Sequence, residues 1–289
     1  MTDPVTGKTG SLFRNDGFDP LWMETNTSTE YWQKGASLLV TDPLGTSDLE
    51  LPGNARSYLL SGTQHGAVSW MTSTRGSCAN ARNPHGPVPL QRALFVALDE
   101  WVDGKAPPAT RTPRLANGTL TSVEKVAFPA IPGVVVPKRI HEIGVIKDWT
   151  KPEIDMSKPY RTLVPQVDAD GNETSGVLLP DIAVPVATYT GWNLYRAPFP
   201  DTELCDRDGT YAPFPRTRAE REAKNDPRRS LEERYGSHAN YVARYQEAVQ
   251  RLVKERLLLP QDGERYMARV RSDEVAKLFA ASIVGRAAP

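Results

Sequence analysis

The sequence predicts an α/β fold, and three features of the first hundred residues support that prediction. Residues 20–28 have the pattern of a strand that runs into a polar turn, and residues 55–62 form a short apolar strand ending in glycine. Residues 88–104 carry apolar side chains at three- and four-residue steps, from Leu90 to Trp101, as an amphipathic helix does. Alternating strands and helices with short connections are typical of layered α/β folds.

The middle of the chain is rich in proline. The sequence has 25 prolines in 289 residues, whereas average usage of about 5% would give about 14. Most of them fall between residues 84 and 215, which predicts turns and extended chain rather than long helices. Strand-like pieces occur at 133–140, 160–180 and 182–195, and the second of these looks like a hairpin that turns at 168–172.

Residues near the C-terminus are helical in pattern and highly charged. A helix is expected over 241–259, ending before Pro260, and another is expected after Ser272, a suitable N-cap. A shorter helix is expected over 29–39, weakened by Gly35. The predicted organisation is an α/β part at 1–104, a proline-rich strand and loop region at 105–215, and a charged helical region at 216–289.

Composition argues against several classes of function. The 35 basic and 35 acidic residues cancel, so the chain lacks the excess positive charge that nucleic-acid binding needs. No apolar run reaches the roughly 18 residues of a membrane span, and the first residues do not resemble a secretion signal. Cys78 and Cys205 lie far apart without metal-ligand spacing. We interpret them as two unrelated thiols, although a bridge between them is possible.

Several motif-like stretches have simpler interpretations. TGKTG at 6–10 lacks the upstream glycine of a phosphate-binding loop, and DADGNE at 168–173 has its glycine too early for a calcium loop. HEIGV at 141–145 has valine where a zinc-protease helix has its second histidine. His85 lies among turn-forming residues and is expected to be exposed, and His238 is expected at the surface near a helix start. No metal and no cofactor is predicted.

His65 is the strongest candidate for a catalytic residue. It directly follows an apolar strand, and the flanking Gly62 and Gly66 leave the backbone free to present the ring outward. Glu30 occupies the matching place after the preceding strand, although Glu24 or Asp42 could replace it. An imidazole acts as a general base when a carboxylate fixes its tautomer and stabilises the imidazolium that forms. Glu30 and His65 are therefore the predicted acid and base.

The order acid, helix, strand, histidine is also that of the last elements of an α/β-hydrolase, and many long stretches resemble one family. They include NTSTEYW, SGTQHG, FPAIPG, VPQVDADGNETSGVLLPDIAVPVATYTGWNLY and ELCDRDGTYAPFPRTRAEREAKNDPRRSLEERYGS. The chain resembles the C-terminal half of a large bacterial α/β-hydrolase-domain family of mostly uncharacterised, esterase-like members. The resemblance implies the last strands of that fold, followed by the proline-rich region and the C-terminal helices.

The resemblance also implies a nucleophile that this sequence does not contain. A serine elbow requires Gly-x-Ser-x-Gly between a strand and a helix, upstream of the acid, and no such stretch is present. The implied function is hydrolysis of a small ester or lactone by a Ser-His-acid mechanism, with the serine in a missing N-terminal half. The chain alone is expected to be inactive.

Two alternatives remain open. The chain could be a non-catalytic remnant or a partner-binding fragment, since a sheet that has lost strands exposes an edge. It could also use His65 as a base for water or for a metal-bound water, although the sequence supplies no cluster of metal ligands. The aromatic run from Tyr189 to Tyr195 could line a pocket, but core packing is the favoured interpretation.

Overall fold

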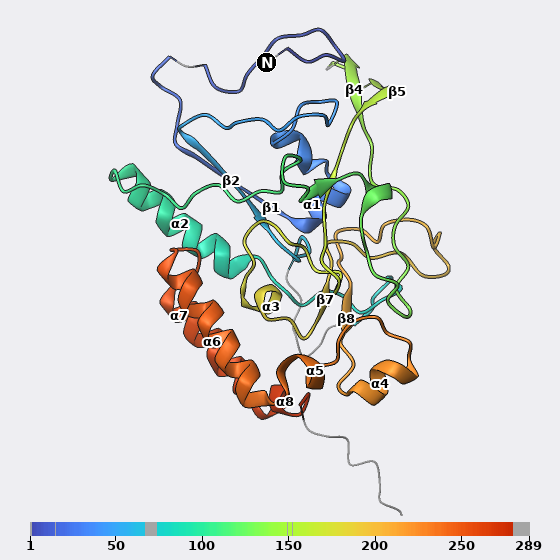
Figure 1. Ribbon diagram of the computed structural model, residues 1–289. Helices are drawn as coiled ribbons and strands as arrows, with labels where there is room; N and C mark the ends of the chain where they lie inside the picture. The colour runs from blue at the N-terminus through green and yellow to red at the C-terminus, as the bar shows by residue number, and fades with distance from the viewer. Residues whose placement is uncertain (1, 15, 67–73, 149, 152, 280–289) are drawn as a thin grey trace, which may run out of the picture.

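The computed structural model describes residues 2–14, 16–66, 74–148, 150–151 and 153–279. Two parallel strands form its α/β part (Figure 1). β1 (Trp22–Thr27) pairs with β2 (Ala55–Leu60) in a register that runs from Trp22 opposite Ala55 to Thr27 opposite Leu60. Because the strands are parallel, both end at the same edge of the sheet. They fall within the two predicted segments, 20–28 and 55–62, so both strand predictions are confirmed.

The connection between the strands contains two short helices rather than one. α1 (Ser28–Gln33) is followed by a 3-10 helix, η1 (Ala36–Leu39). Gly35 separates them with a φ of 66°, a conformation that side chains other than glycine rarely adopt. A Cβ at this position would lie 2.3 Å from the side chain of Ile143. The single helix predicted over 29–39 is therefore wrong, because glycine breaks it rather than weakens it.

The long helices lie together along one side of the molecule (Figure 1). α2 (Val88–Val102) buries Leu90, Ala93, Leu94 and Ala97, and its Arg92 forms a two-bonded ion pair with Asp262 of α7 (Pro260–Val270). α6 (His238–Lys254) packs against α7. The predicted helix over 241–259 is too long at its C-terminal end. α6 ends at Lys254. Pro260, which was expected to stop the predicted helix, is instead the first residue of α7, a position where the missing N–H of proline costs nothing.

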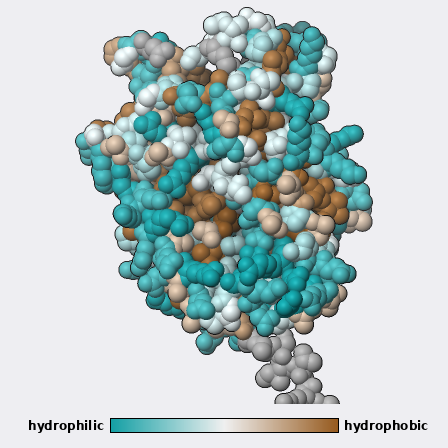
Figure 2. Space-filling view, in the orientation of Figure 1, coloured by the Kyte–Doolittle hydropathy of each residue, from teal (hydrophilic) through white to brown (hydrophobic). Residues whose placement is uncertain are grey.

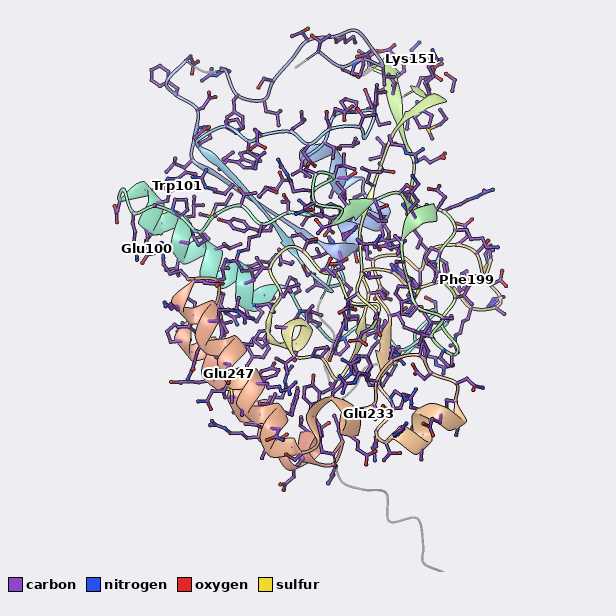
Figure 3. All side chains as sticks on the ribbon, in the orientation of Figure 1. Glu100, Trp101, Lys151, Phe199, Glu233 and Glu247 are labelled. Atoms are coloured by element: carbon purple, nitrogen blue, oxygen red, sulfur yellow. A yellow bond between two sulfur atoms is a disulfide. The ribbon has the colours of Figure 1, made fainter. Side chains whose placement is uncertain are left out.

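The proline-rich region forms short antiparallel pairs. They are β3 (Leu120–Thr121) with β6 (Val164–Pro165), β4 (Ile143–Asp148) with β5 (Glu153–Tyr160), and β7 (Ala187–Tyr189) with β8 (Tyr211–Pro213). Residues 133–140 form no strand, so that prediction is wrong. The β4–β5 hairpin was not predicted, and Figure 3 places Lys151 at its tip.

Short helices complete the described part of the chain. They are η2 (Val123–Lys125), α3 (Pro180–Ala183), α4 (Arg218–Ala223), α5 (Leu231–Tyr235) and α8 (Asp273–Ala276). Ser272 caps α8 by accepting a hydrogen bond from the N–H of Val275, as predicted. The helix was predicted to continue to residue 284, but α8 ends at Ala276 and residues 277–279 are not helical, so the prediction is too long there; its part from residue 280 lies outside the described residues. Within the described chain, no helix is long and apolar enough to cross a bilayer.

Two large apolar cores join the three predicted regions. One core combines Tyr58 and Leu60 of β2 with Tyr245 and Leu252 of α6. The other contains Trp32 of α1 together with residues of the proline-rich region, among them Trp192, which confirms core packing for part of the aromatic run. Hydrophilic residues surround separate apolar patches on the face in Figure 2. The boundaries at 104 and 215 stay predictions, although the cores cross them.

Candidate active site

The turns that follow β1 and β2 bring two of the predicted site residues together. Nδ1 of His65 lies 2.5 Å from Oε1 of Glu30. The His65 side chain is 50% exposed and that of Glu30 is 17% exposed. An ionised carboxylate only accepts hydrogen bonds, so the hydrogen between them belongs to Nδ1 and the lone pair of the neutral ring belongs to Nε2. The pair therefore leaves Nε2 as the atom that can take up a proton.

The first turn of α1 orients Glu30. Thr27 is the N-cap of that helix and Glu30 occupies its third position, so the carboxylate reaches back to the N-cap in a capping box. Oε2 of Glu30 accepts hydrogen bonds from the main-chain N–H of Thr27, at 2.6 Å, and from the Thr27 hydroxyl. One carboxylate oxygen is thus held by its own helix while the other faces His65.

A buried polar network holds the turn that carries His65. Gly62 has a φ of 64° and packs against Ile182, where a Cβ would lie 2.4 Å from the nearest side-chain atom. Oε1 of Gln64 accepts hydrogen bonds from the N–H groups of Asn83 and Gly209, and the Asn83 amide donates to the carbonyl of Gly62. The histidine ring is exposed, but the backbone beneath it is fixed.

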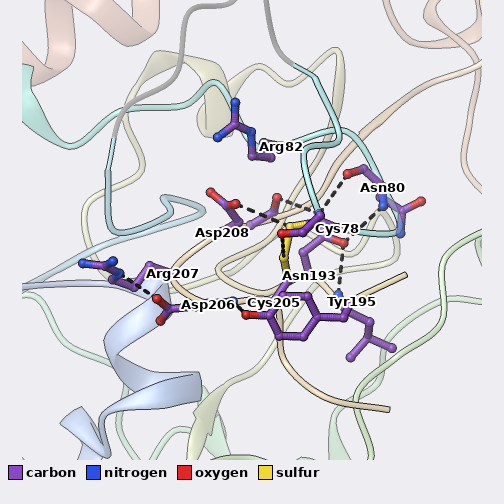
Figure 4. The surroundings of a disulfide bond; sticks show 12 residues. Cys78, Asn80, Arg82, Asn193, Tyr195, Cys205, Asp206, Arg207 and Asp208 are labelled. Carbon is purple, nitrogen blue, oxygen red and sulfur yellow. Dashed lines mark hydrogen bonds and ion pairs between the residues drawn. A yellow bond between two sulfur atoms is a disulfide. The ribbon is translucent and has the colours of Figure 1, made fainter. Parts of the chain in front are cut away.

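A disulfide anchors the loop beside this turn (Figure 4). Cys78 and Cys205 are bridged across 127 residues of sequence, so the interpretation as unrelated thiols is wrong. The main-chain N–H of His65 donates to the carbonyl of Arg207, at 3.3 Å, and the Gln33 side chain bonds to main-chain atoms of Cys205 and Arg207. Sequence reasoning missed the bridge because its halves meet only in the folded chain.

The disulfide and a neighbouring aspartate form the one group of potential metal ligands found among the described residues. It consists of Cys78, Cys205 and Asp208. Both sulfur atoms belong to the disulfide, and a metal requires thiolates rather than a disulfide. In its oxidised form this group does not have the donor set of a metal centre.

The alternative acids have other partners. The side chain of Glu24 accepts from Asn26, at 3.5 Å, and burial raises the pKa of its carboxyl. Asp42 accepts hydrogen bonds from the N–H groups of Thr46 and Ser47 within its own turn. Neither carboxylate has a recorded contact with His65 within the described chain.

The other histidines differ in part from their predicted environments. His85 is buried, contrary to the prediction, and its Nδ1 lies 3.3 Å from Oδ2 of Asp181. It contacts Asp181 of α3 and the ring of Tyr189 of β7, which its turn-rich local sequence does not reveal. His238 begins α6 and its Nε2 lies 2.7 Å from the carbonyl oxygen of Val270. His141 contacts the carbonyl of Gln33.

Glu173 is a site-proximal residue that sequence reasoning missed. The hairpin predicted at 168–172 is confirmed by the pairing of Val167 with Glu173 and by two hydrogen bonds between Asp168 and Asn172. The Glu173 carboxylate is buried beneath the two turns, and burial raises its pKa to about 7, although bonds from Ser28 and Gly62 favour the charged form. Glu173 lies far from both turns in sequence, so no local sequence pattern indicated that it would contact them.

Comparison with known families agrees with this architecture. The sequence profile of a family described as "Alpha/beta hydrolase domain" matches residues 12–268. The chain belongs to this family. No significant match was found among curated proteins or among solved structures.

Proposed function

We propose that the chain supplies the general base and the orienting acid of an esterase-like serine hydrolase. His65 removes the proton from a serine hydroxyl as that oxygen attacks the carbonyl carbon of a small ester or lactone, and Glu30 stabilises the imidazolium. The imidazolium then donates its proton to the leaving alcohol, and an acyl-enzyme forms. Water hydrolyses the acyl-enzyme in a second cycle that uses the same base.

The observation that carries the proposal is the contact of 2.5 Å between Nδ1 of His65 and Oε1 of Glu30. Glu30 and His65 follow two consecutive strands, and their contact supports the proposal because a Ser-His-acid mechanism uses such a bond between the acid and Nδ1 of the histidine. Half of the His65 side chain is exposed, which is compatible with proton exchange between this ring and a nucleophile.

The nucleophile is proposed to come from an N-terminal half outside this chain. No Gly-x-Ser-x-Gly occurs in the sequence. Within the described residues, no strand pairs with the edge of β1 that faces away from β2. Parallel sheets in α/β proteins usually have more strands than two, so this edge is suited to a parallel strand from the N-terminal half.

A fluorophosphonate probe tests the proposal, because it reacts covalently with activated serines. We expect no labelling of this chain alone, and labelling of a polypeptide in which an upstream Gly-x-Ser-x-Gly segment from the same locus is joined to it. His65→Asn should abolish that labelling. A labelled serine between residues 1 and 289 would refute the assignment of the nucleophile to another segment.

Sequencing the DNA upstream of the first codon provides the second test. An in-frame or neighbouring Gly-x-Ser-x-Gly segment is expected. If none exists, a non-catalytic fragment becomes the better interpretation, and association through the open edge of β1 would then be the property to measure.

A further inference from the structure

Glu173 connects the two turns that carry the proposed acid and base. Its Oε2 accepts a hydrogen bond of 2.6 Å from the hydroxyl of Ser28 and one of 2.9 Å from the main-chain N–H of Gly62. Ser28 is the first residue of α1, two positions before Glu30, and Gly62 lies three positions before His65. A single carboxylate oxygen therefore bonds to both turns close to their functional residues.

The turns have few other direct connections. Pairing between β1 and β2 ends with Thr27 opposite Leu60. In the described chain, no hydrogen bond between main-chain atoms joins residues 28–33 to residues 61–66. The Ser28 hydroxyl also lies 3.5 Å from the carbonyl of Leu60, at the limit of a hydrogen bond. Beyond the strand ends, Glu173 is therefore one of two single-residue bridges between these segments; the other is the main chain of Arg207, which bonds to the Gln33 side chain and to the N–H of His65.

Glu173 is itself held firmly. The side chain of the adjacent Asn172 donates to the carbonyl of Ala187, at 3.0 Å, and accepts from the N–H of Tyr189, at 2.9 Å. On the other side, Gly176 lies so close to Ser61 that a Cβ would approach its hydroxyl to 2.5 Å. The carboxylate thus projects from a hairpin that is fixed to β7 and to the end of β2.

We propose that Glu173 is a positioning residue, which sets the distance between the α1 turn and the His65 turn so that Glu30 and His65 remain in contact. This inference rests on the proposed function for its catalytic meaning. Burying a carboxyl group without a cationic partner is costly. The hydrogen bonds that Glu173 accepts from the two turns offset part of that cost, and they hold the turns at a fixed distance from each other. The raised pKa of Glu173 reflects the same burial.

The test measures the proton on Nδ1 of His65 in the labelled chain by NMR, through its rate of exchange with water. The signal should be present in the native chain and absent from Glu30→Gln if the pair forms. In Glu173→Ala, the two turns lose their common acceptor, and we expect exchange to accelerate by about tenfold or more. Glu173→Gln keeps an acceptor oxygen and should restore a rate close to the native one.

Asp262 provides the matched control, because it is another buried carboxylate and its ion pairs, with Arg92 of α2 and Arg265 of α7, involve neither turn nor the hairpin that carries Glu173. Asp262→Ala should lower the melting temperature but leave the His65 exchange rate unchanged. If Glu173→Ala does not fold, Ser28→Ala removes one of the two bonds and should still accelerate exchange several-fold.

If Glu173→Ala exchanges this proton at the native rate, the positioning role is overturned while the proposed function stays intact. The same holds for Ser28→Ala if that variant is used because Glu173→Ala does not fold. An equal acceleration in Asp262→Ala would also overturn the positioning role, because the effect would then follow general destabilisation. If the native chain shows no Nδ1 signal, the pair is not formed, and both the positioning role and the proposed base–acid assignment fail.

Discussion

The described part of the chain contains two histidine–carboxylate pairs, which differ in almost every physical respect. In the first, His65 and Glu30 lie on turns, and half of the imidazole surface is exposed. In the second, His85 and Asp181 are buried, with side-chain exposures of 1% and 5%. The Asp181 carboxylate also accepts hydrogen bonds from Tyr245 and Arg269.

The difference separates a pair that can exchange protons with a substrate from one that stabilises the fold. Burial alone would raise the pKa of Asp181, but Arg269 and His85 outweigh it and hold the pKa well below its ordinary value. Its oxygens are occupied and its histidine has no access to solvent. Glu30, in contrast, has one oxygen bonded to its own helix and one bonded to an exposed ring.

The largest effect is expected on catalysis. In a polypeptide that joins this chain to its upstream serine segment, His65→Asn should lower kcat/KM for a model ester by about a thousandfold or more, since the serine loses its base. His85→Asn is the matched control and should leave kcat nearly unchanged in the folded fraction. Equal losses in the two variants would show that the two pairs do not have separate roles.

The next effect is expected on stability. Asp181→Asn removes the buried negative charge that pairs with His85 and Arg269. Loss of one member of a buried ion pair costs up to about 3–5 kcal/mol, and we expect the lower end of that range because the Arg269 side chain is 29% exposed. Urea denaturation followed by circular dichroism measures the loss. A change below about 1 kcal/mol would mean that the buried network does not hold α3 against α7.

The sequence predicted the exposed pair better than the buried one, for a physical reason. His65 and Glu30 each follow a strand whose apolar pattern is local, so their positions at one sheet edge can be deduced. His85 contacts Asp181 and Tyr189, both distant in sequence, and Glu173 lies 111 residues from Gly62. The β4–β5 hairpin has mostly exposed residues on both faces, so it lacks the alternation that reveals a strand.

A smaller effect is expected from pH. The pKa of Glu173 is about 7 in the folded chain against an ordinary value of 4.5, so the folded state holds a proton that the unfolded state has released. Stability should therefore fall as pH rises between these values, by on the order of 3 kcal/mol. Glu173→Gln does not titrate, so its stability relative to the native chain should increase by that amount between pH 4.5 and pH 8.

Denaturant titrations at several pH values measure that difference. Glu247, an exposed residue of α6 (Figure 3), supplies the matched control. The stability of Glu247→Gln relative to the native chain should stay within about 0.5 kcal/mol over the same range. A difference between Glu173→Gln and the native chain that does not change with pH would show that the carboxyl is ionised in both states.

The smallest effect on stability is expected when Glu30 of the exposed pair is replaced by glutamine, because this change keeps the capping box of α1. Glutamine at position 30 can still accept a bond from the N–H of Thr27 in a capping box, so Glu30→Gln should cost only a few tenths of a kcal/mol. Glu30→Ala removes that bond and should cost about 1 kcal/mol. Both values come from the same denaturant titrations as Asp181→Asn. A loss of several kcal/mol in Glu30→Gln would place this pair, like the buried one, among the groups that stabilise the fold.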